Sequence, residues 1–126
     1  MKPINKYFPK SKNIPIDKFI GNALYDKNYG YYSKKIPFGK NGDFVTAPEI
    51  SFLFSEMLAL WVISLWEHLN RPKIFNIVEL GPGSGKMSST LLRVFKKFPN
   101  FFNSSNVFLY EKSKHLKELQ KKNLFG

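Results

Sequence analysis

Val78-Glu79-Leu80-Gly81-Pro82-Gly83-Ser84-Gly85 is the stretch that decides the fold. It ends an apolar, β-branched run over 73–80, which is typical of a central strand in a parallel sheet. Three glycines at alternate positions let the backbone turn tightly and approach a ligand without a Cβ in the way. A helix predicted over 86–98 would point its free N–H groups at that ligand. The stretch therefore predicts a strand, a ligand-binding loop and a helix in succession.

Three classes of ligand use such a loop, and the spacing of the glycines separates them. A phosphate-binding P-loop needs Gly-x-x-x-x-Gly-Lys-Ser/Thr, but Leu80 stands at its first glycine and Met87 at its hydroxyl position. A dinucleotide fingerprint needs Gly-x-Gly-x-x-Gly, whose third glycine falls on Lys86. The chain does fit acidic, apolar, Gly-x-Gly-x-Gly, with Glu79 as the acid, which is the first motif of class I methyltransferases. A glycine turn that binds no ligand is the remaining alternative.

A second strand and helix follow the first pair. An apolar run over 107–111 predicts the strand, 99–106 is predicted as a loop, and 113–124 as a helix opened by a serine cap. Glu111 ends this strand, where the motif's usual companion acid accepts both ribose hydroxyls, a task that suits a carboxylate. The order strand, helix, strand, helix predicts a doubly wound α/β fold. Because two strands do not make a stable parallel sheet, we expect an incomplete domain.

A long helix is predicted ahead of the glycine loop. Thr46 and Glu49 have the spacing of a capping box, so the helix is expected to start there and to run to about Leu69. Its apolar residues lie nearly all round, which predicts cover on several sides and a packing role for Trp61 and Trp66. The segment that holds Thr46 has two interpretations, helix capping or a lid over a ligand.

The composition excludes several kinds of site. The 126 residues include no cysteine, which rules out disulfides, thiolate zinc sites and a cysteine nucleophile. His68 and His115 do not have the spacing of metal ligands, so no metal is expected. The most apolar stretch, 50–66, is shorter than the roughly 20 residues of a membrane span and contains Glu56. We therefore expect no membrane span and a cytoplasmic location.

The net charge of +11 raises the question of nucleic acid. Only Arg71 and Arg93 of the 20 basic residues are arginine, the residue that phosphate and base recognition favour. The lysines are spread along the chain rather than clustered. This distribution favours a solvated basic surface over a nucleic-acid site.

Four blocks of sequence, in order between about 14 and 124, resemble the MidA-like methyltransferases. Residues 24–32 resemble the family's Leu-Tyr, short gap and Gly-Tyr-Tyr. Residues 42–51 resemble its Gly-Asp-Phe followed by Thr-Ser/Ala-Pro-Glu-Ile-Ser. The glycine loop over 79–85 matches with its proline, and the fourth block is Tyr110-Glu111-Lys112-Ser113 followed by Leu116 and Gln120. The family commonly has Arg and Thr around the last loop glycine, where this chain has Ser and Lys.

The resemblance implies the N-terminal portion of a Rossmann-like class I methyltransferase that uses S-adenosyl-L-methionine. A protein arginine would be the methyl acceptor, linked in mitochondrial members to complex I assembly, and a eukaryotic protein would lie in the mitochondrial matrix. We divide the chain into an N-terminal helical or lid segment, 1–72, with a helix over 14–25, and the truncated start of the cofactor-binding domain, 73–126. This portion alone is expected to be inactive. A non-catalytic basic α/β binding module and an inactive truncated fragment are the alternatives.

The candidate site residues lie on the glycine loop, at the end of the second strand and in the lid. The glycine backbones are assigned to the cofactor's amino-acid portion, Glu79 to its ammonium or the loop amides, and Glu111 to the ribose. Asp43 is the candidate catalytic residue, because a carboxylate there could face the sulfonium or an incoming guanidinium. The predicted cofactor-binding set is Glu79, Gly81, Pro82, Gly83, Gly85, Glu111 and Thr46.

Overall fold

The computed structural model describes residues 13–34, 42–43, 45 and 51–125. They belong to two compact units, Met1–Ile36 and Pro37–Gly126. The units divide inside the N-terminal segment predicted from the sequence, and the long helix ahead of the glycine loop belongs to the second unit.

The first unit contains α1 (Ile16–Tyr25) and the short α2 (Tyr31–Lys34). The carboxylate of Asp26 shapes the turn between them, since its Oδ1 accepts the N–H groups of Asn28 at 2.9 Å and Tyr29 at 2.8 Å. The ring of Tyr32 then stacks on that of Tyr25, with 5.5 Å between the centroids. The helix predicted over 14–25 is confirmed to within two residues.

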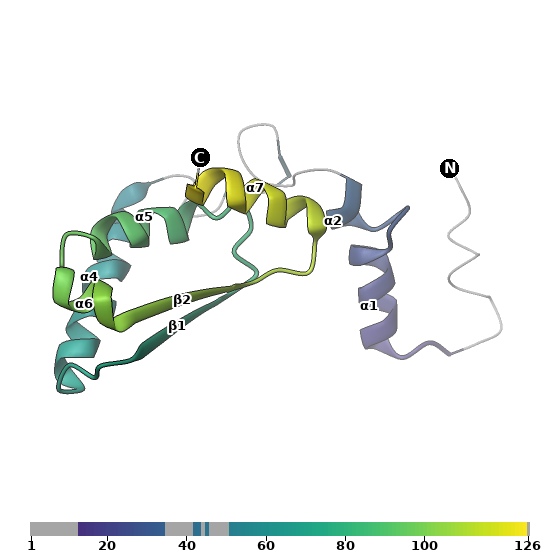
Figure 1. Cartoon of the computed structure of the whole chain (residues 1–126). Coiled ribbons are helices and arrows are strands. Elements are labelled where there is room, and N and C mark those ends of the chain that lie inside the picture. Colours follow the sequence, from purple (N-terminus) through teal and green to yellow (C-terminus); the bar gives the residue numbers. More distant parts are fainter. Residues whose placement is uncertain (1–12, 35–41, 44, 46–50, 126) are drawn as a thin grey trace. The chain divides into compact units, whose positions relative to one another are not determined.

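The second unit is built on two parallel strands in register. Its elements, in chain order, are α4 (Phe52–His68), β1 (Phe75–Leu80), α5 (Lys86–Phe95), α6 (Pro99–Ser104), β2 (Ser105–Tyr110) and α7 (Lys114–Phe125). Residues with partly buried side chains alternate with exposed ones along both strands. Figure 1 shows α5 and α7 on the same side of the two strands. One face of this sheet is therefore covered by helices.

The core of the second unit lies where α4, α5 and α6 meet that face. Phe95 and Phe101 are almost completely buried and meet edge to face, with ring centroids 4.8 Å apart. Trp66 packs on Phe101 at 5.4 Å, and its indole N–H donates to the Pro72 carbonyl at 2.9 Å. This hydrogen bond satisfies the one polar group that the buried indole carries.

The ends of α4 follow from local chemistry. Ser51 is the N-cap, and its hydroxyl accepts the N–H of Leu53 at 3.1 Å. At the other end Asn70 has a φ of 60°, and the N–H of Arg71 donates to the Trp66 carbonyl at 3.0 Å, as in a Schellman motif. The predicted end near residue 69 is confirmed, but the helix begins at Phe52 rather than at the predicted cap, and 46–50 lie outside the described residues.

Two other expectations for this unit were wrong. Residues 99–106 were predicted as a loop, but Pro99 occupies the first turn of α6 and Phe101 is drawn into the core. Tertiary packing therefore turns a polar stretch into a helix and starts β2 at Ser105. Trp61 was expected to pack, yet it is 62% exposed on the outer face of α4.

Replacing Phe95 with Ala tests the core. We expect the free energy of unfolding to fall by about 3–5 kcal/mol, because the change removes a fully buried ring from the centre of the aromatic cluster. Urea unfolding followed by circular dichroism measures it. Phe125→Ala is the matched control, since that ring is exposed in α7, and its effect should stay within about 0.5 kcal/mol. Equal effects of the two changes would contradict the assignment of the core.

Candidate functional site

The glycine loop leaves the sheet where both strands end. The register places Leu80 opposite Tyr110, and the N–H of Gly81 donates to the Tyr110 carbonyl at 2.9 Å, which continues the ladder by one residue. Gly81, Gly83 and Gly85 have φ values of 68°, 56° and 79°, a region that residues with a Cβ rarely adopt. Each of the three alternating glycines therefore occupies a position whose backbone has a positive φ. The loop ends at the N-terminus of α5, where Gly85 is the N-cap and provides no side-chain cap.

Glu79 lies under this loop, on the face of β1 that the helices cover. The hydroxyl of Ser88, a fully buried residue of α5, donates to its Oε2. Burial raises the pKa of Glu79 above the ordinary glutamate value, and the hydrogen bond from Ser88 opposes that rise in part. A carboxylate held this way favours a cation as a neighbour, because a positive charge would offset its loss of solvation.

Glu111 directly follows β2, beside the start of the loop. Its Oε1 accepts the N–H groups of Lys112 at 2.7 Å and Ser113 at 2.8 Å, so one carboxylate oxygen is committed to the turn before α7. Its Oε2 lies 3.4 Å from the side-chain nitrogen of Gln120. The predicted role of Glu111 is to accept hydrogen bonds from both ribose hydroxyls. Because Oε1 already accepts two backbone N–H groups, Oε2 is the oxygen better placed to accept from a hydroxyl.

Helix α7 packs against the far side of the glycine loop. The Gln120 side chain donates to the Gly83 carbonyl at 2.9 Å, and the Asn123 side chain donates to the Ser84 carbonyl at 2.8 Å. A Cβ on Gly85 would lie 3.2 Å from the Cγ of Gln120, closer than most such contacts. Sequence analysis assigned Gln120 only a place in a motif, although a primary amide among the apolar positions of a helix is a signal of buried hydrogen bonding.

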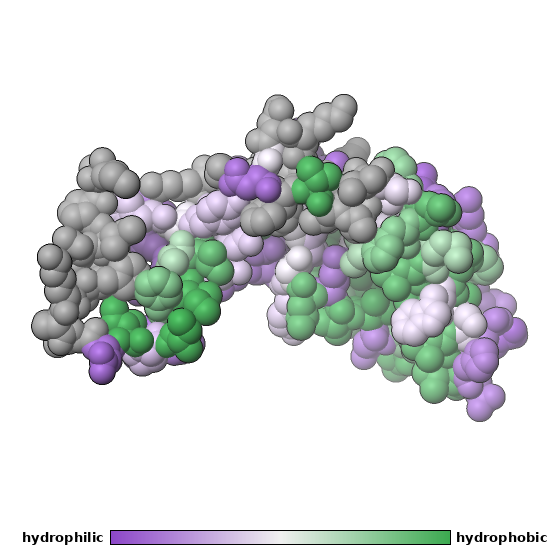
Figure 2. Space-filling view, turned by 180° about the vertical axis from the view of Figure 1, so that it is seen from behind, coloured by the Kyte–Doolittle hydropathy of each residue, from purple (hydrophilic) through white to green (hydrophobic). Residues whose placement is uncertain are grey.

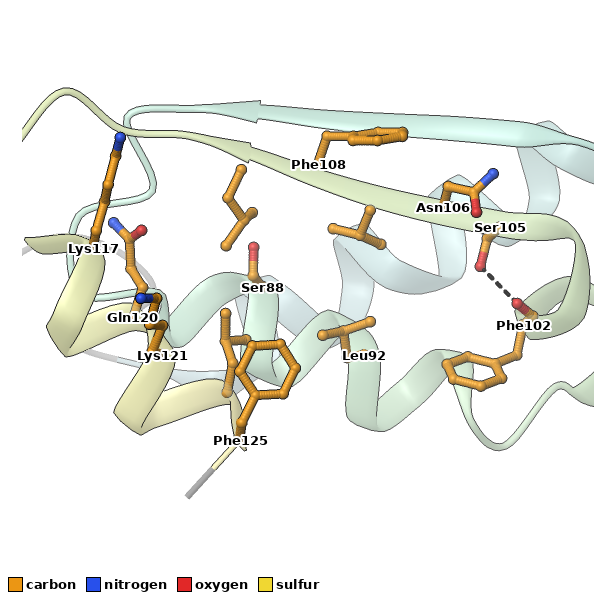
Figure 3. Close-up of a pocket in the computed structure, with 13 residues that line it drawn as sticks. Ser88, Leu92, Phe102, Ser105, Asn106, Phe108, Lys117, Gln120, Lys121 and Phe125 are labelled. Atoms are coloured by element: carbon orange, nitrogen blue, oxygen red, sulfur yellow. Dashed lines mark hydrogen bonds between the residues drawn. The ribbon is translucent and has the colours of Figure 1, made fainter.

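A groove of about 590 Å³ runs between β2, α5 and α7 (Figure 3). Leu92, Phe108 and Phe125 give it an apolar lining, with Lys117 and Lys121 on the α7 side. It follows the body of β2, whereas ligands of open α/β sheets bind beyond the carboxyl ends of the strands. Among the described residues β2 pairs only with β1, so the groove marks the open edge of the sheet. It borders the predicted site through Ser88 and Gln120, which are among its lining residues.

The predicted lid residues are placed less fully. Asp43 is among the described residues and is exposed, whereas its neighbour Phe44 lies outside the described residues. Thr46 lies outside the described residues, so its proposed part in the site stays a prediction. Within the described ranges there is no group of acidic, histidine or cysteine side chains that could hold a metal ion. No helix of those same ranges combines the length and hydropathy that crossing a bilayer requires.

Comparison with known proteins identifies the family. Residues 57–126 match the family model described as "Putative S-adenosyl-L-methionine-dependent methyltransferase". The chain belongs to this methyltransferase family. It is 40% identical over 115 residues to protein arginine methyltransferase NDUFAF7, mitochondrial, of Xenopus tropicalis, and 37% identical over 109 residues to the Homo sapiens protein of that name. The resemblance seen in the four sequence blocks is thereby confirmed.

Comparison with a solved structure shows that the similarity includes the fold. A Burkholderia thailandensis protein described as a "likely methyl transferase", whose crystal structure contains S-adenosyl-homocysteine, superposes with a TM-score of 0.68 at 28% identity. The alignment covers 88% of this chain and 29% of that one. The Xenopus and human alignments cover 90% and 85% of this chain and 27% and 25% of the relatives. The chain therefore shares part of a class I methyltransferase fold and spans about a quarter of the length of these relatives.

The partly buried carboxylate of Glu79 predicts a pH-dependent stability. The folded protein keeps a proton on Glu79 at pH values where the unfolded chain has released it. The free energy of unfolding should therefore fall as the pH rises from the ordinary pKa of glutamate to the raised one. Glu79→Gln keeps an acceptor for Ser88 but cannot ionise, so we expect a smaller fall and higher stability at neutral pH. Urea unfolding between about pH 4 and pH 8 measures both slopes.

Glu118→Gln is the matched control, because that carboxylate is exposed and pairs with Lys121 at the surface. It should leave the pH dependence as in the unchanged protein. If the free energy of unfolding of Glu79→Gln changed with pH as steeply as that of the wild-type protein, Glu79 would not be the source of the pH dependence.

Proposed function

We propose that this chain is the S-adenosyl-L-methionine-binding N-terminal part of a protein arginine methyltransferase. The observation that carries the proposal is the joint position of the glycine loop and Glu111 at the carboxyl ends of adjacent parallel strands. Ligands of this fold bind there. The family match and the relatives' names support the reaction, and the S-adenosyl-homocysteine in the related crystal structure supports the cofactor.

The residues present fit the cofactor's chemistry. Gly81 is exposed and an added Cβ there would meet nothing within 4 Å, so its backbone groups can be approached by the amino-acid portion. The carboxylate of Glu79 suits the ammonium, and Oε2 of Glu111 suits a ribose hydroxyl. Bound S-adenosyl-L-methionine supplies an activated methyl group on a sulfonium. The work of these residues is accordingly to bind and orient, which accounts for much of the rate gain in such a reaction.

The acceptor and the setting are proposed from the relatives. Their names specify protein arginine and the mitochondrion, so we assign a protein arginine as acceptor and the mitochondrial matrix as the location in a eukaryote. The family resemblance adds a link to complex I assembly. Asp43 is the proposed catalytic candidate, because an exposed carboxylate can meet a guanidinium in a paired hydrogen-bonding geometry.

Binding of S-adenosyl-homocysteine by the full-length protein tests the proposal by titration calorimetry. The variant is Gly81→Ala, because a Cβ there would meet nothing within 4 Å and only the backbone conformation is penalised. Left-handed backbone costs an L-residue about 1–2 kcal/mol, so we expect roughly a tenfold loss of affinity. Gly21→Ala in α1 is the control, since it also adds a Cβ in open space but at an ordinary helical position.

Two results would count against the methyltransferase. One is a folded full-length protein that gives no heat with S-adenosyl-homocysteine. The other is a protein that binds random DNA with a steep salt dependence and does not bind S-adenosyl-homocysteine. That result would favour the basic binding module, with the charge of +11 as its functional feature.

A further inference from the structure

We propose that Gln120 is a positioning residue that holds the glycine loop and the Glu111 carboxylate in a single geometry for the cofactor. The inference rests on the proposed function and names a residue outside the predicted site. Gln120 belongs to α7, and its side-chain nitrogen lies within hydrogen-bonding reach of groups on both strand ends.

The burial of Gln120 gives its hydrogen bonds their weight. Leu116 and Gln120 are the buried residues of α7, and Gln120 is only 4% exposed. A buried amide is costly unless it is hydrogen-bonded, and an apolar side chain would pack at this position without that cost. The amide is therefore placed for what it bonds to rather than for packing.

The first of these partners is the glycine loop. The Gln120 nitrogen donates to the Gly83 carbonyl at 2.9 Å, a normal hydrogen-bond length. Gly83 is buried and has a φ of 56°, so this bond fixes a peptide that an unrestrained glycine could turn in several ways. The Cγ of the same side chain lies against Gly85, where an added Cβ would meet it at 3.2 Å. Gln120 thus shapes the loop from the side opposite its ligand face.

The second partner is Glu111. Its Oε1 accepts two backbone N–H groups, from Lys112 and Ser113. The Gln120 nitrogen is 3.4 Å from Oε2, longer than a strong hydrogen bond, so it orients this oxygen and leaves it able to accept from a ribose hydroxyl. One amide therefore fixes the orientation of a carboxylate whose other oxygen is anchored by its own turn.

A residue that touches both groups sets the separation between them. The loop would hold the amino-acid portion of the cofactor and Glu111 its ribose, yet they belong to different strands. A rigid link between the two fixes where the sulfonium lies relative to the acceptor, and small misplacements of reacting groups cost large factors in rate. Gln120 acts through these groups and does not itself meet the reacting atoms.

Titration calorimetry of the full-length protein with S-adenosyl-homocysteine and with its 2′-deoxyribose analogue tests this role. Gln120→Met keeps the length of the side chain but removes the donor, and we expect roughly a tenfold loss of affinity for S-adenosyl-homocysteine. The preference for the 2′-hydroxyl should shrink as well, as it should in Glu111→Gln. Asn123→Ala is the matched control, because it breaks a loop contact of α7 at Ser84 that does not involve Glu111, and it should keep that preference.

The shift in preference separates positioning from general destabilisation. A loss of affinity that is equal for both ligands would overturn the proposal, and so would a Gln120→Met protein that binds as the unchanged one does. Gln120→Asn is a second variant for the case in which Gln120→Met does not fold. It retains the amide but is too short to make both contacts, so the same loss of preference for the 2′-hydroxyl is expected.

Hydrogen exchange of the ligand-free protein distinguishes this inference from the proposed function. The backbone amides of Gly85 in the loop and Ser113 in the turn should both exchange faster in Gln120→Met than in the wild-type protein, because the link between loop and turn is lost. Unchanged protein that gives no heat with S-adenosyl-homocysteine would refute the methyltransferase proposal, whereas unaltered exchange at both amides would refute the role of Gln120.

Discussion

The parallel register of β1 and β2 is the constraint on which the candidate site depends. It sets Leu80 opposite Tyr110, and the next residue, Gly81, donates its N–H to the Tyr110 carbonyl. The loop and Glu111 therefore begin at one level of the sheet. The same alternation directs Glu79 toward the helices and Leu80 away from them. A shift of β1 by one residue would turn Glu79 to the opposite face of the sheet and would move the loop relative to Glu111.

The outer face of α4 carries much exposed apolar surface (Figure 2), and the face of the sheet away from the helices also exposes large apolar side chains. Val78, Leu80 and Phe108 are exposed on the strands, although parallel sheets normally bury both faces. The groove along β2 is a third such surface, where an edge strand leaves backbone groups unpaired. Relatives more than three times as long have further chain with which to cover such surfaces. We therefore regard the described elements as one side of the family fold, the side that supplies the proposed cofactor loop.

Local patterns made the strands and the loop predictable, because each depends on residues close in sequence. The glycines at 81, 83 and 85 indicated left-handed backbone, and the apolar runs before the loop and before Glu111 indicated parallel strands. The helix over 99–104 was missed because the burial of Phe101 against distant aromatic rings stabilises it. Gln120 was missed for a related reason, since its partners lie 9 and 37 residues away. The roles of Asp43 and Thr46 stay predictions, because most of their segment is outside the described residues.

The two carboxylates of the candidate site differ in a way that matches the two ends of the proposed cofactor. Burial raises the pKa of Glu79, and its hydrogen bond from Ser88 offsets only part of that cost, so a cation beside it would favour the ionised form. Glu111 instead has backbone N–H groups on one oxygen, which satisfies it without a counter-charge and suits it to a neutral diol. An ammonium near Glu79 and a ribose near Glu111 would therefore each meet the environment that they require. The reverse orientation would leave the partly buried Glu79 without a positive partner, so the electrostatics of the pair favours one direction of binding across the loop.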